Sequence, residues 1–202
     1  MTDAWVGFAG AIIGVLVGAG ITIYQDIRKE KRVRREDAQY LAIRVSCMLD
    51  RFVKGCLDVA YDDGTSEGLP AGKDGAYEPQ IREPEFPINT IDGNWKSIRS
   101  DLMYQLLGFP SRIEHADHLV GVVAFNEDDP GNAGWVAERQ FQYATLGLEA
   151  VDLAIALRRD YSIPTQAGGD EPAASLRKCL DGLLERRRKI EAMRAAATSL
   201  ID

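Results

Sequence analysis

The chain has 202 residues, of which 46% are hydrophobic and 27% are charged, proportions typical of a folded protein rather than a disordered one. Its 31 acidic residues outnumber its 24 basic ones, and the formal net charge is −7. This balance excludes a general nucleic-acid binder, because such proteins carry a basic excess. The three cysteines, Cys47, Cys56 and Cys179, do not form the spacing pattern of a disulfide framework, so we expect reduced thiols.

The first element is an uncharged segment from Ala4 to Gln25. As a helix it would be about 33 Å long, which matches the roughly 30 Å of hydrocarbon in a bilayer. Trp5 and Tyr24 lie at its two ends, where aromatic rings favour the headgroup zone. A cleaved signal peptide fits less well, because the apolar run is too long and no basic residue precedes it. We therefore predict a single-pass transmembrane anchor over residues 1–25.

The flanks of this segment predict its orientation. No basic residue precedes it, whereas a juxtamembrane cluster follows it at Arg28, Lys29, Lys31, Arg32, Arg34 and Arg35. Basic residues beside a span stay on the cytoplasmic side. The N-terminus is therefore expected outside and the C-terminus inside a plasma (inner) membrane. The same cluster has a second interpretation, contact with anionic membrane lipid as a partner.

Glycine recurs along one side of the predicted span, at positions 7, 10, 14 and 18. At about 100° per residue, these four positions fall within about 80° of one another. Such a strip of small residues lets a second helix approach closely. We therefore expect a packing strip for self-association or for a partner span, made of Gly7, Gly10, Gly14 and Gly18.

The segment after the span changes from charged to amphipathic. Residues 26–40 are expected to form a charged juxtamembrane helix, and residues 41–202 a cytoplasmic helical domain. An apolar face at helical spacing begins at Leu41 and includes Cys56, whereas Cys47 falls off this face and is expected to be exposed. Residues 62–94 hold four of the eight prolines and are predicted to form a long loop, whose second half packs on the domain through Tyr77, Ile81, Phe86 and Ile88.

Four helices are predicted after the loop. The first is marked by apolar residues from Trp95 to Leu106, and the second opens with a capping-box pattern at Ser111. The third runs from about Trp135 to Tyr161, and the last begins near Glu171, where Pro172 suits a first helical turn. No segment alternates in the manner of a strand. The predicted fold is therefore all-α, a single N-terminal transmembrane helix followed by an antiparallel cytoplasmic helical bundle.

Motifs for chemistry are sparse. His115 and His118 lie three apart beside Glu114 and Asp117, but a bundle metal site draws its ligands from several helices, and a solvated helix start explains them better. Glycine-rich phosphate loops are absent. The basic run from Glu185 to Lys189 is expected to be a solvated face. No catalytic residue, metal ligand or cofactor is predicted.

These observations favour a membrane-tethered, non-enzymatic interaction or scaffold protein with a cytoplasmic protein partner and no nucleic acid. The alternative class is a membrane-anchored enzyme or metal-binding domain. A bound metal or an aligned polar pocket would favour that alternative, and an exposed apolar groove would favour the interaction module.

Overall fold

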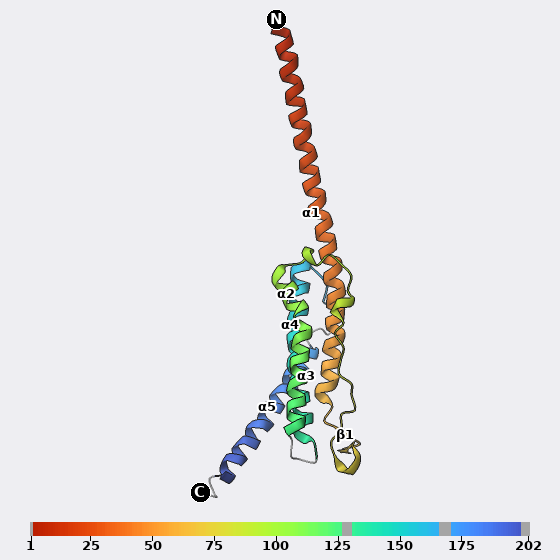
Figure 1. Ribbon diagram of the computed structural model, residues 1–202, viewed down its shortest axis with the longest axis vertical. Helices are drawn as coiled ribbons and strands as arrows, with labels where there is room; N and C mark the ends of the chain where they lie inside the picture. Colours follow the sequence, from red (N-terminus) through yellow and green to blue (C-terminus); the bar gives the residue numbers. More distant parts are fainter. Residues whose placement is uncertain (1, 127–130, 166–170, 199–202) are drawn as a thin grey trace.

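The computed structural model describes residues 2–126, 131–165 and 171–198, with side chains from Tyr24 onward except at positions 74, 194, 195, 197 and 198. The chain is mostly helical, and four helices pack as a bundle (Figure 1). The predicted helical bundle is therefore confirmed.

The first helix, α1, spans Thr2–Tyr61 without a break. At about 1.5 Å per residue it is about 90 Å long, and its first half projects beyond the other helices (Figure 1). Every side chain from Tyr24 to Glu36 is exposed, and burial begins at Ala38. We call residues 24–36 the stalk and residues 38–61 the inner half of α1.

The predicted span lies almost entirely outside the side chains that the structure describes, and so do all four glycines of the packing strip. Within the described part of the chain, a membrane-spanning length of apolar helix does not occur. The transmembrane anchor and its glycine strip therefore stay predictions.

Helix α4 (Ala133–Tyr161) lies at the centre of the bundle and runs antiparallel to its neighbours. Asp50 of α1 pairs with Arg158, whereas Ala60 accepts a hydrogen bond from Gln140, so the residue numbers rise along one helix as they fall along the other. Helix α3 (Phe109–Asn126) is also antiparallel to α4, because Arg112 pairs with Glu149 and Asp117 with Tyr143. Helix α5 (Glu171–Thr198) has the same relation to α4, because Leu176 lies beside Gly147 and Arg187 pairs with Glu138. As a result, α1, α3 and α5 share one direction.

The long connection after α1 explains why α1 and α3 are parallel. It returns along the bundle (Figure 1) through a two-stranded antiparallel hairpin and three short 3-10 helices. These are β1 (Thr65–Ser66), β2 (Leu69–Pro70), η1 (Lys73–Gly75), η2 (Ile88–Thr90) and η3 (Trp95–Ser97). Phe86 and Ile88 are buried as predicted, whereas the prediction was wrong for Ile81, which is 41% exposed.

Two boundaries differ from the sequence pattern. The predicted helix from Trp95 is instead η3 followed by α2 (Ser100–Leu107). Helix α3 already begins at Phe109, one residue after α2, so the predicted cap at Ser111 is wrong. The first turn of a helix tolerates proline, because backbone N–H groups there have no partner within the helix and the missing N–H of proline costs nothing. Pro110 therefore lies inside α3 rather than ending a helix.

Aromatic rings join the loop to the bundle core. Phe52 of α1, Phe86 of the loop and Phe109 of α3 pack edge to face, with centroids 5.1 to 5.5 Å apart. Each ring is at most 8% exposed, and burial of such a side chain contributes about 1.5–3 kcal/mol. The loop is thus part of the core rather than an appendage.

A glycine lets three helices meet. A Cβ atom added at Gly147 of α4 would lie 2.8 Å from Cδ1 of Leu176 in α5 and 2.9 Å from Cβ of Cys56 in α1. Both distances are shorter than ordinary carbon–carbon contact, so only glycine allows this approach without a shift. Beyond this contact, the second half of α5 leaves the bundle (Figure 1).

Candidate functional site

The predicted basic cluster lies on the stalk, where all six of its side chains are exposed. Three of them contact other parts of the chain. Arg28 lies over the Tyr24 ring at 4.7 Å, the Nε atom of Arg32 is 2.9 Å from a Glu36 carboxylate oxygen, and Arg34 donates to a loop carbonyl. The other three, Lys29, Lys31 and Arg35, form no ion pair with any described residue.

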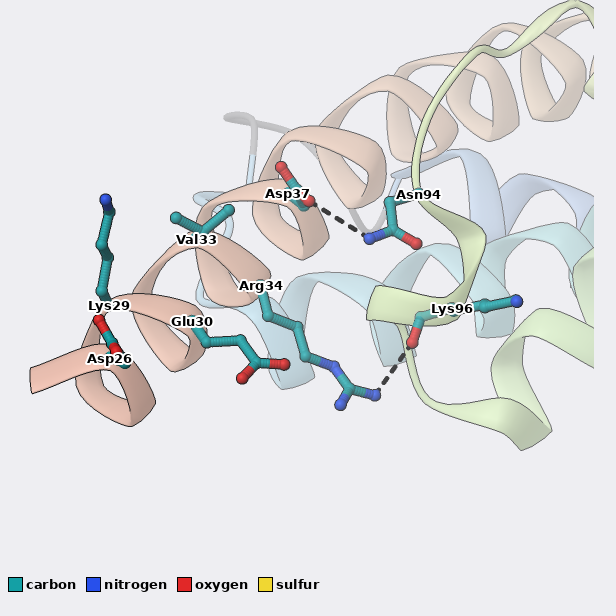
Figure 2. Close-up of a pocket in the computed structure, with 8 residues that line it drawn as sticks. All are labelled: Asp26, Lys29, Glu30, Val33, Arg34, Asp37, Asn94 and Lys96. Carbon is teal, nitrogen blue, oxygen red and sulfur yellow. Dashed lines mark hydrogen bonds between the residues drawn. The ribbon is translucent and has the colours of Figure 1, made fainter. Parts of the chain in front are cut away.

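One side of the stalk carries both signs of charge. Asp26, Lys29, Glu30, Arg34 and Asp37 alternate along it, and with loop residues they line a hollow of about 580 Å³ (Figure 2). Two hydrogen bonds join the stalk to the loop at the end of this hollow nearer the bundle, from Arg34 to the Lys96 carbonyl at 3.1 Å and from Asn94 to Asp37 at 3.3 Å. We call this side the mixed face; its three acidic side chains are matched by Lys29, Arg34 and the loop residue Lys96.

The opposite side of the stalk carries only positive charge. At about 100° per residue, Arg28, Lys31, Arg32 and Arg35 fall within about 100° of one another, and no acidic residue lies among them. We call these four residues the basic stripe. Residues 28–35 together hold six basic side chains and one acidic one, a formal charge of +5 in a chain whose total is −7.

The lower end of the basic stripe meets the carboxyl end of α4. Lys31, Arg34 and Arg35 line a hollow of about 310 Å³ there, together with Asp160, Tyr161, and Ser162. Cations are favoured at this position because the last carbonyls of a helix carry partial negative charge. Asp160 is already engaged, with its carboxylate 2.7 Å from Arg99 and 2.9 Å from Arg159, and so it leaves the cations of the stripe largely uncompensated.

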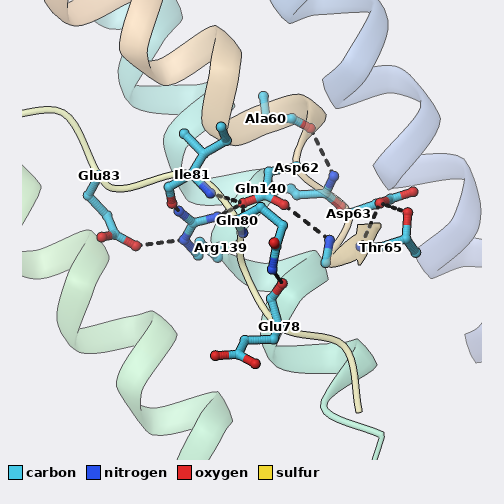
Figure 3. Close-up of polar contacts among 11 residues, drawn as sticks. Ala60, Asp62, Asp63, Thr65, Glu78, Gln80, Ile81, Glu83, Arg139 and Gln140 are labelled. Carbon is cyan, nitrogen blue, oxygen red and sulfur yellow. Dashed lines mark hydrogen bonds and ion pairs between the residues drawn. The ribbon is translucent and has the colours of Figure 1, made fainter. Parts of the chain in front are cut away.

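A buried polar cluster holds the loop at the other end of the bundle (Figure 3). Arg139 of α4, only 1% exposed, lies 3.1 Å from the buried carboxylate of Asp62 and 2.6 Å from the carboxylate of Glu83. It also donates to the carbonyl of Ile81. We call Asp62, Glu83 and Arg139 the clamp, because it ties both ends of the segment 62–83 to one helix.

The clamp satisfies the charges that it buries. Asp62 also accepts from the backbone N–H groups of Gly64, Gln80 and Ile81, at 3.2, 2.8 and 2.8 Å. Removal of this buried carboxylate would leave these donors unpaired. For Glu83, burial alone would raise the pKa, but the hydrogen bond and charge of Arg139, together with a backbone hydrogen bond and the charge of Arg82, hold the pKa below its usual range.

The cysteines, Tyr143 and the two histidines do not form a reactive site among the residues described. Burial raises the pKa of the Cys56 thiol well above its usual range, so this buried residue is a poor nucleophile, whereas Cys47 is exposed as predicted. The pKa of Tyr143 is raised, mainly by burial and secondly by the 2.6 Å hydrogen bond that its hydroxyl donates to Asp117. His115 and His118 are exposed on α3, and no cluster of three metal-ligand side chains occurs among the residues described.

Comparisons with known proteins identify no relative. No protein-family model matches the sequence, and no curated protein or solved structure is significantly similar to it. The functional argument therefore depends on the chain itself.

The clamp was not among the predicted sites, although its signal is in the sequence. Arg139 occupies a position of the apolar face of α4, three residues after Val136 and four before Tyr143, both buried. A charge on a buried face needs a partner. The partner could not be identified from the sequence, because Asp62 lies 77 residues away.

Proposed function

We propose that the chain is a single-pass membrane protein whose helical bundle acts as a cytoplasmic interaction or scaffold module without catalytic activity. The continuity of α1 carries this proposal. One helix includes the uncharged segment 4–25, the exposed stalk and the inner half, whose apolar face is buried in the bundle core. A bundle built on such a helix would be held at a fixed distance from the bilayer.

The stalk supports this arrangement through its exposure. Residues 24–36 extend over about 20 Å and bury no side chain against the bundle. A soluble bundle gains nothing from a charged helix that projects into solvent. A spacer between a bilayer and a cytoplasmic domain, by contrast, needs a polar surface all round and basic residues near the lipid.

The topology is tested by reporter fusions after Asp202. A cytoplasmic reporter should be active and a periplasmic or extracellular one inactive, because the basic residues follow the span and none precede it. The full chain should stay in the membrane fraction after alkaline extraction, and a chain lacking residues 2–25 should leave it. Reporter activity on the outer side would refute the orientation.

We further propose that the glycine strip pairs the spans. Gly14→Ile should reduce association of the full chain in a membrane two-hybrid assay, because a branched side chain would hold the partner backbone away. Leu16→Ala, on the opposite side of the helix, serves as the matched control and should leave association unchanged. Equal signals from both variants and the wild type would remove the strip from the proposal. A metal retained after purification would instead favour the alternative, a membrane-anchored metal-binding domain or enzyme.

A further inference from the structure

We propose that the basic stripe, Arg28, Lys31, Arg32 and Arg35, binds phosphate groups of anionic phospholipids in the leaflet that the predicted span enters. This inference rests on the proposed function, because the span would place the stalk against a bilayer. It adds the chemistry of the lipid and the face of the helix that recognises it.

The separation of charge around the stalk points to one face. The mixed face sets Asp26 and Glu30 beside Lys29 and Arg34 (Figure 2), so a phosphate approaching there would meet carboxylates. The basic stripe presents four cations with a single acid, Glu36, at its edge beside Arg32. Three of the four cations are arginines, whose N–H donors match phosphate oxygens in bidentate geometry.

The contacts that the stripe residues make within the chain are weak enough for a phosphate to bind. The pair between Arg32 and Glu36 is exposed, with 81% and 62% of the two side chains accessible, and such surface pairs are weak and screened by salt. The guanidinium carbon of Arg28 lies over the Tyr24 ring at 4.7 Å, and Arg28 forms no ion pair with a described residue. Neither Lys31 nor Arg35 has an ionic partner among the described residues, so a phosphate would displace no strong contact.

The stripe also lies within reach of the lipid. Arg28 follows the predicted end of the span by about 5 Å along the helix and Arg35 by about 15 Å, against a screening length of roughly 8–10 Å at physiological salt. Transmembrane helices tilt by about 20° on average, which brings one face of a projecting helix closer to the headgroups. Binding through the basic stripe would set the direction of that tilt.

A second basic run provides an internal comparison. Arg186, Arg187, Arg188 and Lys189 lie on α5, in the part that leaves the far end of the bundle (Figure 1). Arg187 pairs with Glu138 and lies over the Phe141 ring at 4.0 Å, and Lys189 is 2.7 Å from Glu185. Two of its four members are paired within the chain, and the run lies at the end of the bundle away from the predicted membrane, so the proposal gives it no lipid contact.

The test uses the two stalk lysines, which lie on opposite faces. The full chain is reconstituted into lipid nanodiscs of phosphatidylcholine alone or with phosphatidylglycerol, and acylation of each lysine by an amine reagent is followed by mass spectrometry. If depth alone mattered, Lys29 would be protected more than Lys31, because it is closer to the span. The proposal predicts the reverse, with acylation of Lys31 about fivefold slower in anionic discs, the effect of one basic residue near an anionic surface.

Lys96 and Lys178 serve as reference sites whose acylation should not depend on the lipid. Replacing Arg28 and Arg35 by Gln should remove most of the protection of Lys31, because two of its three neighbours on the stripe are lost. The matched double replacement of Arg186 and Arg188 by Gln should leave that protection unchanged. High salt should also abolish it, because the screening length falls to about 3 Å at 1 M.

Three results would overturn the proposal, and they are distinguishable. Incorporation into the discs with equal acylation of Lys31 in both lipids would refute lipid binding and leave the proposed anchor intact. Protection of Lys29 equal to or greater than that of Lys31 would refute the assignment to one face. A chain that stays outside the discs would refute the anchor, and the lipid site with it.

Discussion

The stalk and the clamp use charge in opposite ways. In the stalk, the basic side chains are exposed, and five of the six have no ionic partner among the residues described; the exception is Arg32, which pairs with Glu36. The clamp, at the other end of the bundle, buries its charge: Asp62 and Arg139 have side chains 3% and 1% exposed and satisfy each other. Buried charges must stay paired for the fold to be stable, because losing either partner leaves the other unpaired. Exposed charge costs the fold little, and so it is free to meet a ligand.

The largest expected effect comes from breaking the clamp. Arg139→Met should destabilise the fold by about 3–5 kcal/mol, because the buried Asp62 carboxylate loses its cation. Urea denaturation followed by circular dichroism measures the loss. Arg35→Met makes the same chemical change on the stalk and should leave the midpoint unchanged. Similar losses from both variants would contradict the contrast between the stalk and the clamp.

A smaller effect is expected where α4 approaches the inner half of α1. Gly147→Ala should cost about 1–3 kcal/mol, because the new Cβ atom would overlap Leu176 and Cys56. Gly121→Ala, in α3, is the matched control. No atom lies within 4 Å of a Cβ added there, so the change should stabilise the helix by up to about 1 kcal/mol. Urea midpoints of the two variants should therefore move in opposite directions, and a shift in the same direction would refute the close approach.

The smallest expected effect is the dependence of stability on pH through Glu83. Its folded pKa lies below the unfolded value, so its contribution is fully present above about pH 4.3 and is lost as the pH falls through the folded pKa. Between about pH 5 and pH 3 the wild type should lose stability more steeply than Glu83→Gln. The side chain is 46% exposed, so solvent screens the pair and the difference should stay below that of Arg139→Met. Parallel pH profiles of the urea midpoint would show that Glu83 contributes nothing to the clamp.

Much of the helical architecture could be predicted from the sequence, because its signals are local. The apolar spacing from Trp135 to Tyr161 identified α4 within two residues of its start, and Pro172 marked the first turn of α5. The boundary near Ser111 was wrong, since a capping pattern can also occur inside a helix when the preceding residues already form its first turn. The basic stripe was also within reach of the sequence, because about 100° per residue places its four members on one side.

What the sequence determined by itself is therefore the helical class, the approximate positions of the long helices and the polar character of the stalk, since periodicity and charge act over a few residues. Only the tertiary structure decided that α1 and α3 run in the same direction, that the loop returns through the core, and that Asp62 meets Arg139 across 77 positions. These features depend on which distant surfaces fit together. At Gly147, for example, the absence of a side chain matters only because Leu176 and Cys56 pack against that position. Packing of that kind is a property of several helices at once, and no single segment of the chain encodes it.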